Sequence, residues 1–147
     1  MTHLDDTAAL QQRDPGGMLG QVAGLPAQLR GAMALQAAYR AVHGNLHHAG
    51  RRRDVLVCGM GGSAIGGDLA AAWAAPQGVR IAVHRGYGLP AWVDEGTLLV
   101  FSSYSGKTEE ALSAFAAARA RGLGGPCLTT GGALAERARA AALPVYT

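Results

Sequence analysis

The sequence is poor in aromatic residues, has a single lysine and contains no long apolar run. Aromatic residues make up 5% of its 147 residues. No apolar stretch reaches the roughly 18 residues that span a bilayer, and Asp5 and Asp6 stand where a signal peptide would be basic. These absences argue against a membrane protein or a secreted one, and we expect a cytoplasmic protein with no membrane partner.

The basic residues and the cysteines exclude two further classes of site. Apart from the run at 51–53, the arginines are scattered through the chain, whereas nucleic-acid sites cluster cations and aromatics. We therefore expect no nucleic-acid partner. Cys58 and Cys127 lack C-x-x-C spacing, and each lies in an apolar strand-like stretch. We interpret both thiols as buried core groups, not metal or redox ligands.

The first part of the chain predicts an arm and two helices. Residues 1–13 show no periodic apolar pattern and are expected to form a mobile N-terminal arm, so that one domain covers 14–147. Asp14 followed by Pro15 is typical of a capped helix start, and this helix should end near Gly24. Pro26 then predicts a second helix, which fades at Gly44. We expect both helices, within 14–50, to pack across a sheet.

From residue 54 onward, short apolar runs alternate with helical stretches. The predicted strands are β-branched or apolar on both faces, which is typical of a parallel sheet covered by helices. This pattern predicts a flavodoxin-like, doubly wound α/β fold of about five strands, with ligands bound beyond the carboxyl ends of the strands. The expected strands are 55–58, 79–84, 97–101, 126–129 and 144–146, and the expected helices are 63–75, 107–121 and 133–142.

Two loops rich in glycine and hydroxyl groups follow predicted strands and open predicted helices. In the first loop, Gly61 and Gly62 allow a close backbone approach, and Ser63 is placed as a helix N-cap. In the second, Ser103, Ser105 and Thr108 surround a glycine just before a helix. Because a helix N-terminus carries free N–H groups and partial positive charge, two of them on neighbouring strands predict a phosphate site.

Other interpretations of the first loop are weaker. Its glycine string is similar to a dinucleotide fingerprint, but the second strand ends in His84 and Arg85 where an acidic ribose ligand is expected. A nucleotide-binding protein is therefore disfavoured. Asp68 is interpreted as a first-turn partner of the helix dipole or an acceptor for loop amides. A tight strand-to-helix turn without a ligand is the structural alternative.

Three stretches, in this order and spacing, resemble the bifunctional phosphoglucose/phosphomannose isomerases of the sugar isomerase (SIS) domain superfamily. These are residues 59–63, 85–92 and 103–110, and residues 129–134 add a similar Thr-Thr-Gly-Gly stretch. The resemblance covers residues 14–147 and has one departure, Lys107 in place of the usual Asn. It implies an N-terminal SIS domain that binds the 6-phosphate of a sugar through Gly61, Gly62, Ser63, Ser103, Ser105 and Thr108.

The resemblance also implies an activity that this chain is not expected to complete. The whole enzyme would interconvert glucose 6-phosphate or mannose 6-phosphate with fructose 6-phosphate through an enediol, without a metal or other cofactor. In that family, the Glu base and the ring-opening His belong to a second half of the enzyme, and an Arg lies shortly after the position that corresponds to Thr147. We therefore assign no catalytic residue and expect little or no turnover. A homodimer or a partner SIS domain is expected, and the alternative is a non-catalytic sugar-phosphate sensor.

The remaining polar candidates are given mainly structural interpretations. Glu109 and Glu110 suit a first helical turn. His43, His47 and His48 have the spacing of a metal pair but suit a helix C-terminus, so we expect no metal. His84 and Arg85 either line the sugar pocket or are solvated at a strand end, and the sequence leaves both open. Trp73 and Trp92 are expected to be packing residues.

Overall fold

The computed structural model of the chain describes residues 5–43 and 54–147, and side chains in the first range only as far as residue 34. Contacts divide the chain into two units, Met1–His48 and Ala49–Thr147, and each is described by itself. None of the helices in the described ranges has the length and apolar content that crossing a membrane requires.

The first unit contains two helices whose bounds differ from those expected. Helix α1 covers Thr7–Arg13, where the sequence predicted an arm, because the Asp6 carboxylate accepts a hydrogen bond from Ala9 N at 3.0 Å and caps it. Helix α2 is continuous over Met18–His43 and contains Pro26, so the predicted break near Gly24 is wrong. A proline costs one backbone hydrogen bond there, and the surrounding Ala, Leu and Gln residues favour continued helix.

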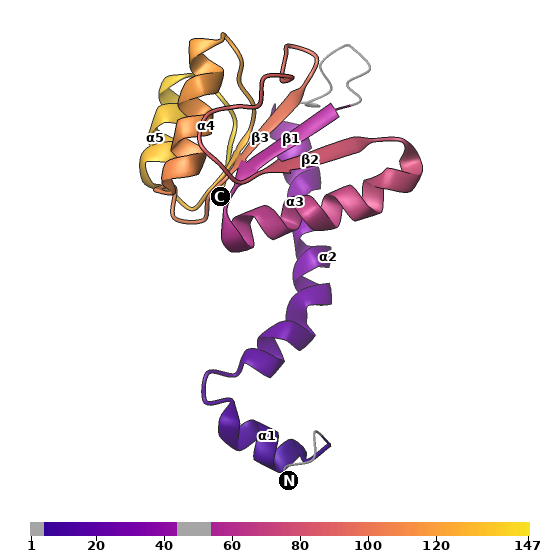
Figure 1. Cartoon of the computed structure of the whole chain (residues 1–147). Coiled ribbons are helices and arrows are strands. Elements are labelled where there is room, and N and C mark those ends of the chain that lie inside the picture. The colour runs from indigo at the N-terminus through magenta and orange to yellow at the C-terminus, as the bar shows by residue number, and fades with distance from the viewer. Residues whose placement is uncertain (1–4, 44–53) are drawn as a thin grey trace. The chain divides into compact units, whose positions relative to one another are not determined.

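The second unit is a five-stranded parallel sheet of order β2-β1-β3-β4-β5 (Figure 1). This confirms the doubly wound α/β prediction, since 2-1-3-4-5 is the flavodoxin-like order. Chain order reverses between β1 and β3. The elements are β1 Asp54–Gly59, α3 Gly61–Ala74, a 3₁₀ turn η1 Ala75–Gln77, β2 Arg80–His84, β3 Leu98–Ser102, α4 Glu109–Ala120, β4 Cys127–Leu128, α5 Gly132–Ala140 and β5 Val145–Tyr146.

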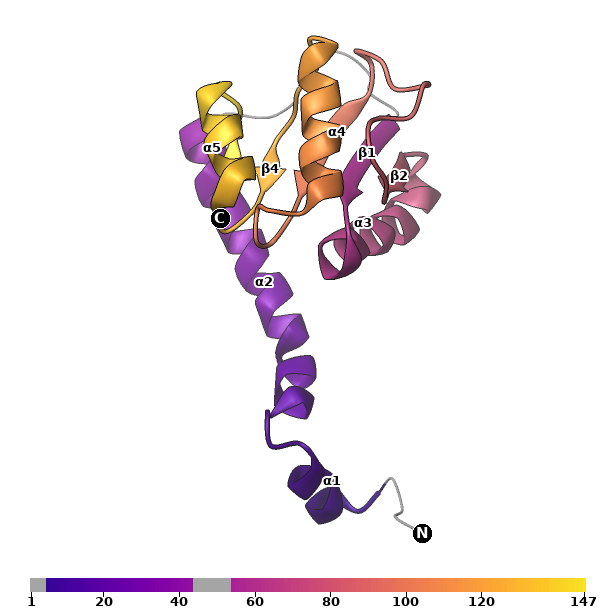
Figure 2. The ribbon, with the colours of Figure 1, turned by 60° about the vertical axis from the view of Figure 1, so that its left-hand side comes forward.

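Helices cover the two faces of the sheet unequally. Helices α4 and α5 lie on one face and α3 lies on the other (Figures 1 and 2). Helix α3 packs on β1 and β2, and it approaches closely because Gly67 lacks a side chain. A Cβ there would lie 2.9 Å from Val83 Cγ2 and 3.1 Å from Val57 Cβ. Residues 85–97, which join β2 to β3, contain no helix.

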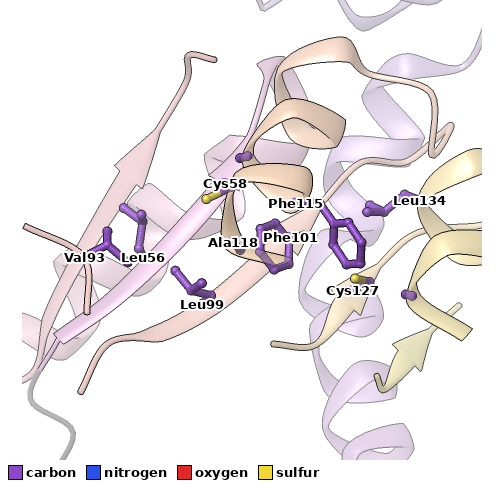
Figure 3. Packing of buried hydrophobic residues seen from close by; sticks show 11 residues of the cluster. Leu56, Cys58, Val93, Leu99, Phe101, Phe115, Ala118, Cys127 and Leu134 are labelled. Carbon is purple, nitrogen blue, oxygen red and sulfur yellow. The ribbon is translucent and has the colours of Figure 1, made fainter. Parts of the chain in front are cut away.

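The hydrophobic core lies between the sheet and the pair α4 and α5 (Figure 3). The Phe101 and Phe115 rings meet edge to face, with centroids 5.2 Å apart and an angle of 73° between their planes, a favourable aromatic geometry. Cys58 and Cys127 are both buried in this cluster, which confirms them as core thiols. This core packs against β1 and β3 and so helps to position the loops that follow these strands.

Candidate functional site

The two predicted loops lie side by side at the carboxyl edge of the sheet. The last residues of the two strands, Gly59 of β1 and Ser102 of β3, are paired in the parallel register. The loops that follow therefore start at the same height, on the neighbouring strands between which chain order reverses. Ligands of doubly wound folds bind at this position.

The first loop leads directly into α3, and its serine is placed differently from the prediction. The N-cap residue is Met60, and α3 has no side-chain cap, so the expectation that Ser63 caps the helix is wrong. Ser63 lies in the first turn, and its hydroxyl oxygen accepts a hydrogen bond from Tyr104 N at 3.1 Å. This contact joins the first loop to the second across 41 residues of sequence.

The hydroxyl groups of the second loop differ in burial. Ser103 is 1% exposed, and its Oγ lies 2.8 Å from Thr108 Oγ1. Ser105 is exposed, and its Oγ accepts a hydrogen bond from Lys107 N at 3.2 Å. Ser103 is thus a buried support for Thr108, while Ser105 and the partly exposed Thr108 lie at the surface that a ligand can reach.

The hydroxyl groups in these loops retain protons that they can donate. A hydroxyl has one donor and two acceptor positions, and Ser63 and Ser105 each use an acceptor position for a backbone N–H. When Ser103 donates to Thr108, the Thr108 proton is likewise available. A ligand at this edge therefore meets O–H donors, which suits an anion.

Helix ends at this edge add further donors. In the first unit, Asp14 accepts hydrogen bonds from Met18 N at 2.7 Å and Leu19 N at 2.8 Å, at the start of α2. Helices α3 and α4, by contrast, have Met60 and Thr108 as N-cap residues and no side-chain cap. Uncapped N-terminal N–H groups and the helix dipole both favour negative charge. The two loops thus combine hydroxyl and backbone donors around one position.

A cavity of about 340 Å³ opens beside the loops and shares Ser63 with them. It lies at the carboxyl ends of β1, β3, β4 and β5, and its wall combines hydroxyl groups with two tyrosines and one leucine. Its lining residues are Ser63, Ser102, Tyr104, Leu128, Thr129, Thr130, Tyr146 and Thr147.

The strand-end candidates form pairs away from this cavity. His84 Nε2 lies 3.1 Å from the Gly88 carbonyl oxygen, and Arg85 forms an ion pair with Asp68. Neither His84 nor Arg85 lines the 340 Å³ cavity. Asp68 is outside the first turn of α3, so its interpretation as a partner of the helix dipole is wrong, and its partner is an arginine side chain rather than a loop amide.

Glu109, in the first turn of α4, contacts the segment that follows β2. Glu109 and Glu110 occupy the first turn of α4, and Glu109 accepts a hydrogen bond from the Tyr87 hydroxyl at 3.1 Å. This hydrogen bond, together with the charges of both glutamates, raises the pKa of Tyr87 above its ordinary value. Gly88 N also donates to Ser113 Oγ on α4 at 3.0 Å. Glu109 is thus tied to a neighbouring loop.

Other candidates fall outside the site. Trp73 is 73% exposed on α3, so its expected packing role is wrong, and Trp92 is also exposed and lines a cavity near Asp54, where β1 begins. His47 and His48 lie outside the described residues. Within the described ranges, no group of three or more His, Cys, Asp or Glu lies close enough to hold a metal ion.

Comparisons with known proteins point to one kind of enzyme. No family model matches the chain. The chain is 46% identical over 94 residues to the bifunctional phosphoglucose/phosphomannose isomerase of Caldicellulosiruptor bescii, a stretch covering 63% of this chain and 28% of that protein. It is 40% identical over 96 residues to the Aquifex aeolicus protein of the same name, covering 64% and 30% respectively, and 36% identical over 83 residues to the Thermoplasma acidophilum one, covering 56% and 26%.

These matches show partial homology. The chain is related over about 60% of its length to bifunctional phosphoglucose/phosphomannose isomerases, and the matched stretch covers less than a third of each of those proteins.

Proposed function

We propose that this chain binds the phosphate of a hexose 6-phosphate at the junction of the β1–α3 and β3–α4 loops. The observation that carries the proposal is the meeting of two helix N-termini that lack side-chain caps with the hydroxyl groups of the loops that follow adjacent strands. The partial homology to isomerases whose names specify phosphorylated glucose and mannose supports the sugar. The proposed phosphate ligands are Gly61, Gly62, Ser63, Ser105 and Thr108, with Ser103 supporting Thr108 from below.

The cavity beside the loops suits the sugar part of the ligand. Its volume of about 340 Å³ lies within the range of roughly 300–1,000 Å³ usual for small-molecule sites. Tyr104 and Tyr146 line its wall together with Thr129 and Thr130. With the phosphate held at the loops, we propose that the sugar ring extends along this wall.

We propose that this chain alone binds the sugar phosphate without converting it, and that the catalytic groups lie outside the stretch matched in the relatives. Aldose–ketose isomerisation needs a base to move a proton between C1 and C2 and a cation or donor to stabilise the enediolate. Two charged groups near the loops already have partners: Glu109 holds Tyr87, and Arg85 holds Asp68. Binding without turnover is the activity expected of the chain alone.

Isothermal titration calorimetry with glucose 6-phosphate, glucose and inorganic phosphate tests this function. We expect glucose 6-phosphate to bind more tightly than phosphate, and glucose to bind at least tenfold more weakly, because phosphate contacts supply the charge-assisted hydrogen bonds. Ser105→Ala should weaken glucose 6-phosphate binding by about tenfold, since hydrogen bonds to charged groups are the stronger class.

The matched control for this experiment is Thr97→Val. Thr97 is buried just before β3, at the opposite end of that strand from the loops, and the variant should bind glucose 6-phosphate as the original chain does. Equal affinity for glucose and glucose 6-phosphate would contradict the proposal. A coupled assay for fructose 6-phosphate shows whether any turnover accompanies binding.

We further propose that the chain acts in the cytoplasm as a dimer or beside a partner SIS domain. Ile65, Leu69 and Trp73 are exposed at helical spacing along α3, and exposed apolar patches of this kind mark protein contacts. A native mass measurement that gives only monomers at high concentration would contradict the dimer.

A further inference from the structure

The backbone of Tyr104 is the point at which three loops meet. Its N–H donates to Ser63 Oγ of the β1–α3 loop at 3.1 Å. Its carbonyl oxygen accepts two hydrogen bonds from Thr130 of the β4–α5 loop, one from the backbone N–H at 3.1 Å and one from Oγ1 at 2.7 Å. One residue of the second loop is thus held from both sides.

The β4–α5 loop and the first turn of α5 contact the second loop over more than this residue. Leu134 N donates to the Gly106 carbonyl oxygen at 2.9 Å. A Cβ on Gly106 would lie 1.8 Å from the Gly131 carbonyl oxygen, and a Cβ on Gly132 would lie 2.5 Å from the Ser105 carbonyl oxygen. The two backbones therefore approach each other as closely as glycine allows, and the start of α5 lies directly against the backbone of Ser105 and Gly106.

The Thr130 side chain is not part of the buried core. Thr130 is exposed, whereas its neighbour Thr129 is 4% exposed and bonded to Gly131. An exposed hydroxyl competes with water for its partner, so such a hydrogen bond contributes about 1 kcal/mol at most. The effect of this hydrogen bond is to orient the Tyr104 carbonyl group, which immediately precedes Ser105.

We propose that Thr130 is a positioning residue for the phosphate site, acting through the backbone of Tyr104. This inference rests on the proposed function. By holding Tyr104, Thr130 keeps Ser105 and the start of α4 in the arrangement that an anion needs before it arrives. A loop ordered in advance loses less conformational entropy on binding, which raises affinity.

The test compares Thr130→Val, which keeps the shape and removes the hydroxyl, with Thr130→Ser, which restores it. Calorimetry with glucose 6-phosphate and with inorganic phosphate measures affinity, and urea unfolding measures stability. We expect Thr130→Val to weaken both ligands by about fivefold, within the range for one hydrogen bond, and Thr130→Ser to bind as the original chain does.

Thr97→Val is the matched control. The Thr97 hydroxyl also forms a local hydrogen bond, to Asp94, but it lies at the amino end of β3, away from the loops. This variant should lose stability without losing affinity. If Thr130→Val binds both ligands as tightly as the original chain, or if its affinity loss is no greater than that of Thr97→Val, the positioning role is wrong.

Amide hydrogen exchange separates failure of this inference from failure of the proposed function. If the original chain binds neither ligand, the function fails, and exchange of the amides in residues 103–108 still decides the role of Thr130. We expect these amides to exchange faster in Thr130→Val and at the original rate in Thr130→Ser. Unchanged exchange in Thr130→Val would overturn the inference.

Discussion

The Ser103 and Thr108 hydroxyl oxygens lie 2.8 Å apart, one buried under the second loop and the other at its surface. This contact takes the Thr108 hydroxyl away from its usual N-cap role, since α4 has no side-chain cap. The arrangement leaves the first N–H groups of α4 without a side-chain cap.

Replacement of Ser103 tests this arrangement. Ser103→Ala should lower the free energy of unfolding by about 1 kcal/mol and weaken glucose 6-phosphate binding severalfold, because Thr108 then loses its buried hydrogen-bond partner. Urea unfolding and calorimetry measure the two effects. Ser113→Ala is the control, since Ser113 on α4 accepts a hydrogen bond from Gly88 N instead. An equal loss of affinity in both variants would count against the Ser103–Thr108 pair.

Glycine is required at position 106 for two reasons. Its φ is +64°, and a Cβ would lie 1.8 Å from the Gly131 carbonyl oxygen. Gly106→Ala should therefore destabilise the fold by more than the roughly 1–2 kcal/mol of left-handed backbone strain alone. Gly122→Ala, with φ +70° and nothing within 4 Å of a Cβ, carries the strain alone. Urea unfolding that gives equal losses for the two variants would show that the close contact is relieved without cost.

The raised pKa of Tyr87 depends on Glu109. Because the hydrogen bond to Glu109 is the largest cause of the raised pKa, Glu109→Gln should lower the Tyr87 pKa toward the ordinary value for tyrosine. An NMR titration of ¹³C-labelled tyrosine measures this shift. Glu136→Gln on α5 serves as the control and should leave the Tyr87 titration unchanged. A Tyr87 pKa unaffected by Glu109→Gln would mean that the hydrogen bond does not form in solution.

The two core thiols should make the fold sensitive to alkali. Burial raises the pKa of Cys58 to about 12 and that of Cys127 to about 11. Between the unfolded thiol pKa, near 9, and these values, the folded state binds more protons than the unfolded state, so the free energy of unfolding falls as the pH rises. Each thiol contributes a slope of up to about 1.4 kcal/mol per pH unit.

Urea unfolding from pH 8 to pH 10.5 measures this slope, and the variant Cys58→Ala with Cys127→Ala removes the contribution of both thiols. The slope of this double variant should be smaller than that of the original chain. Identical slopes would show that the thiols are not protected from ionisation by burial.

The alternation of apolar runs and helical stretches predicted the sheet unit well. All five strands lie within two residues of the expected bounds, because buried parallel strands carry a continuous apolar signal that needs no distant partner. The N-terminal helices were harder. The tendency of proline to begin a helix predicted a break at Pro26, whereas neighbouring helix-forming residues keep α2 continuous. How these helices pack stays a prediction.

The sequence identified the loops of the candidate site but not the roles of all their residues. Glycine and hydroxyl groups before two helices predicted a phosphate site in these loops, since the N–H groups of a helix start follow from local sequence. Nothing local signalled that Ser103 is buried, or that Thr130 bonds to Tyr104. The Thr-Thr-Gly-Gly stretch gave the one hint of the third loop.

By itself, the sequence determined the succession of strands and helices along the chain and the hydrogen-bond donors that each loop carries. Both depend on residues close together in the chain. Only the tertiary structure decided which loops meet. Ser63 reaches the backbone of Tyr104 across 41 residues because β1 and β3 are neighbours in the sheet, and that pairing is fixed by how the whole sheet buries its apolar faces. The same packing sets Thr130 against Tyr104.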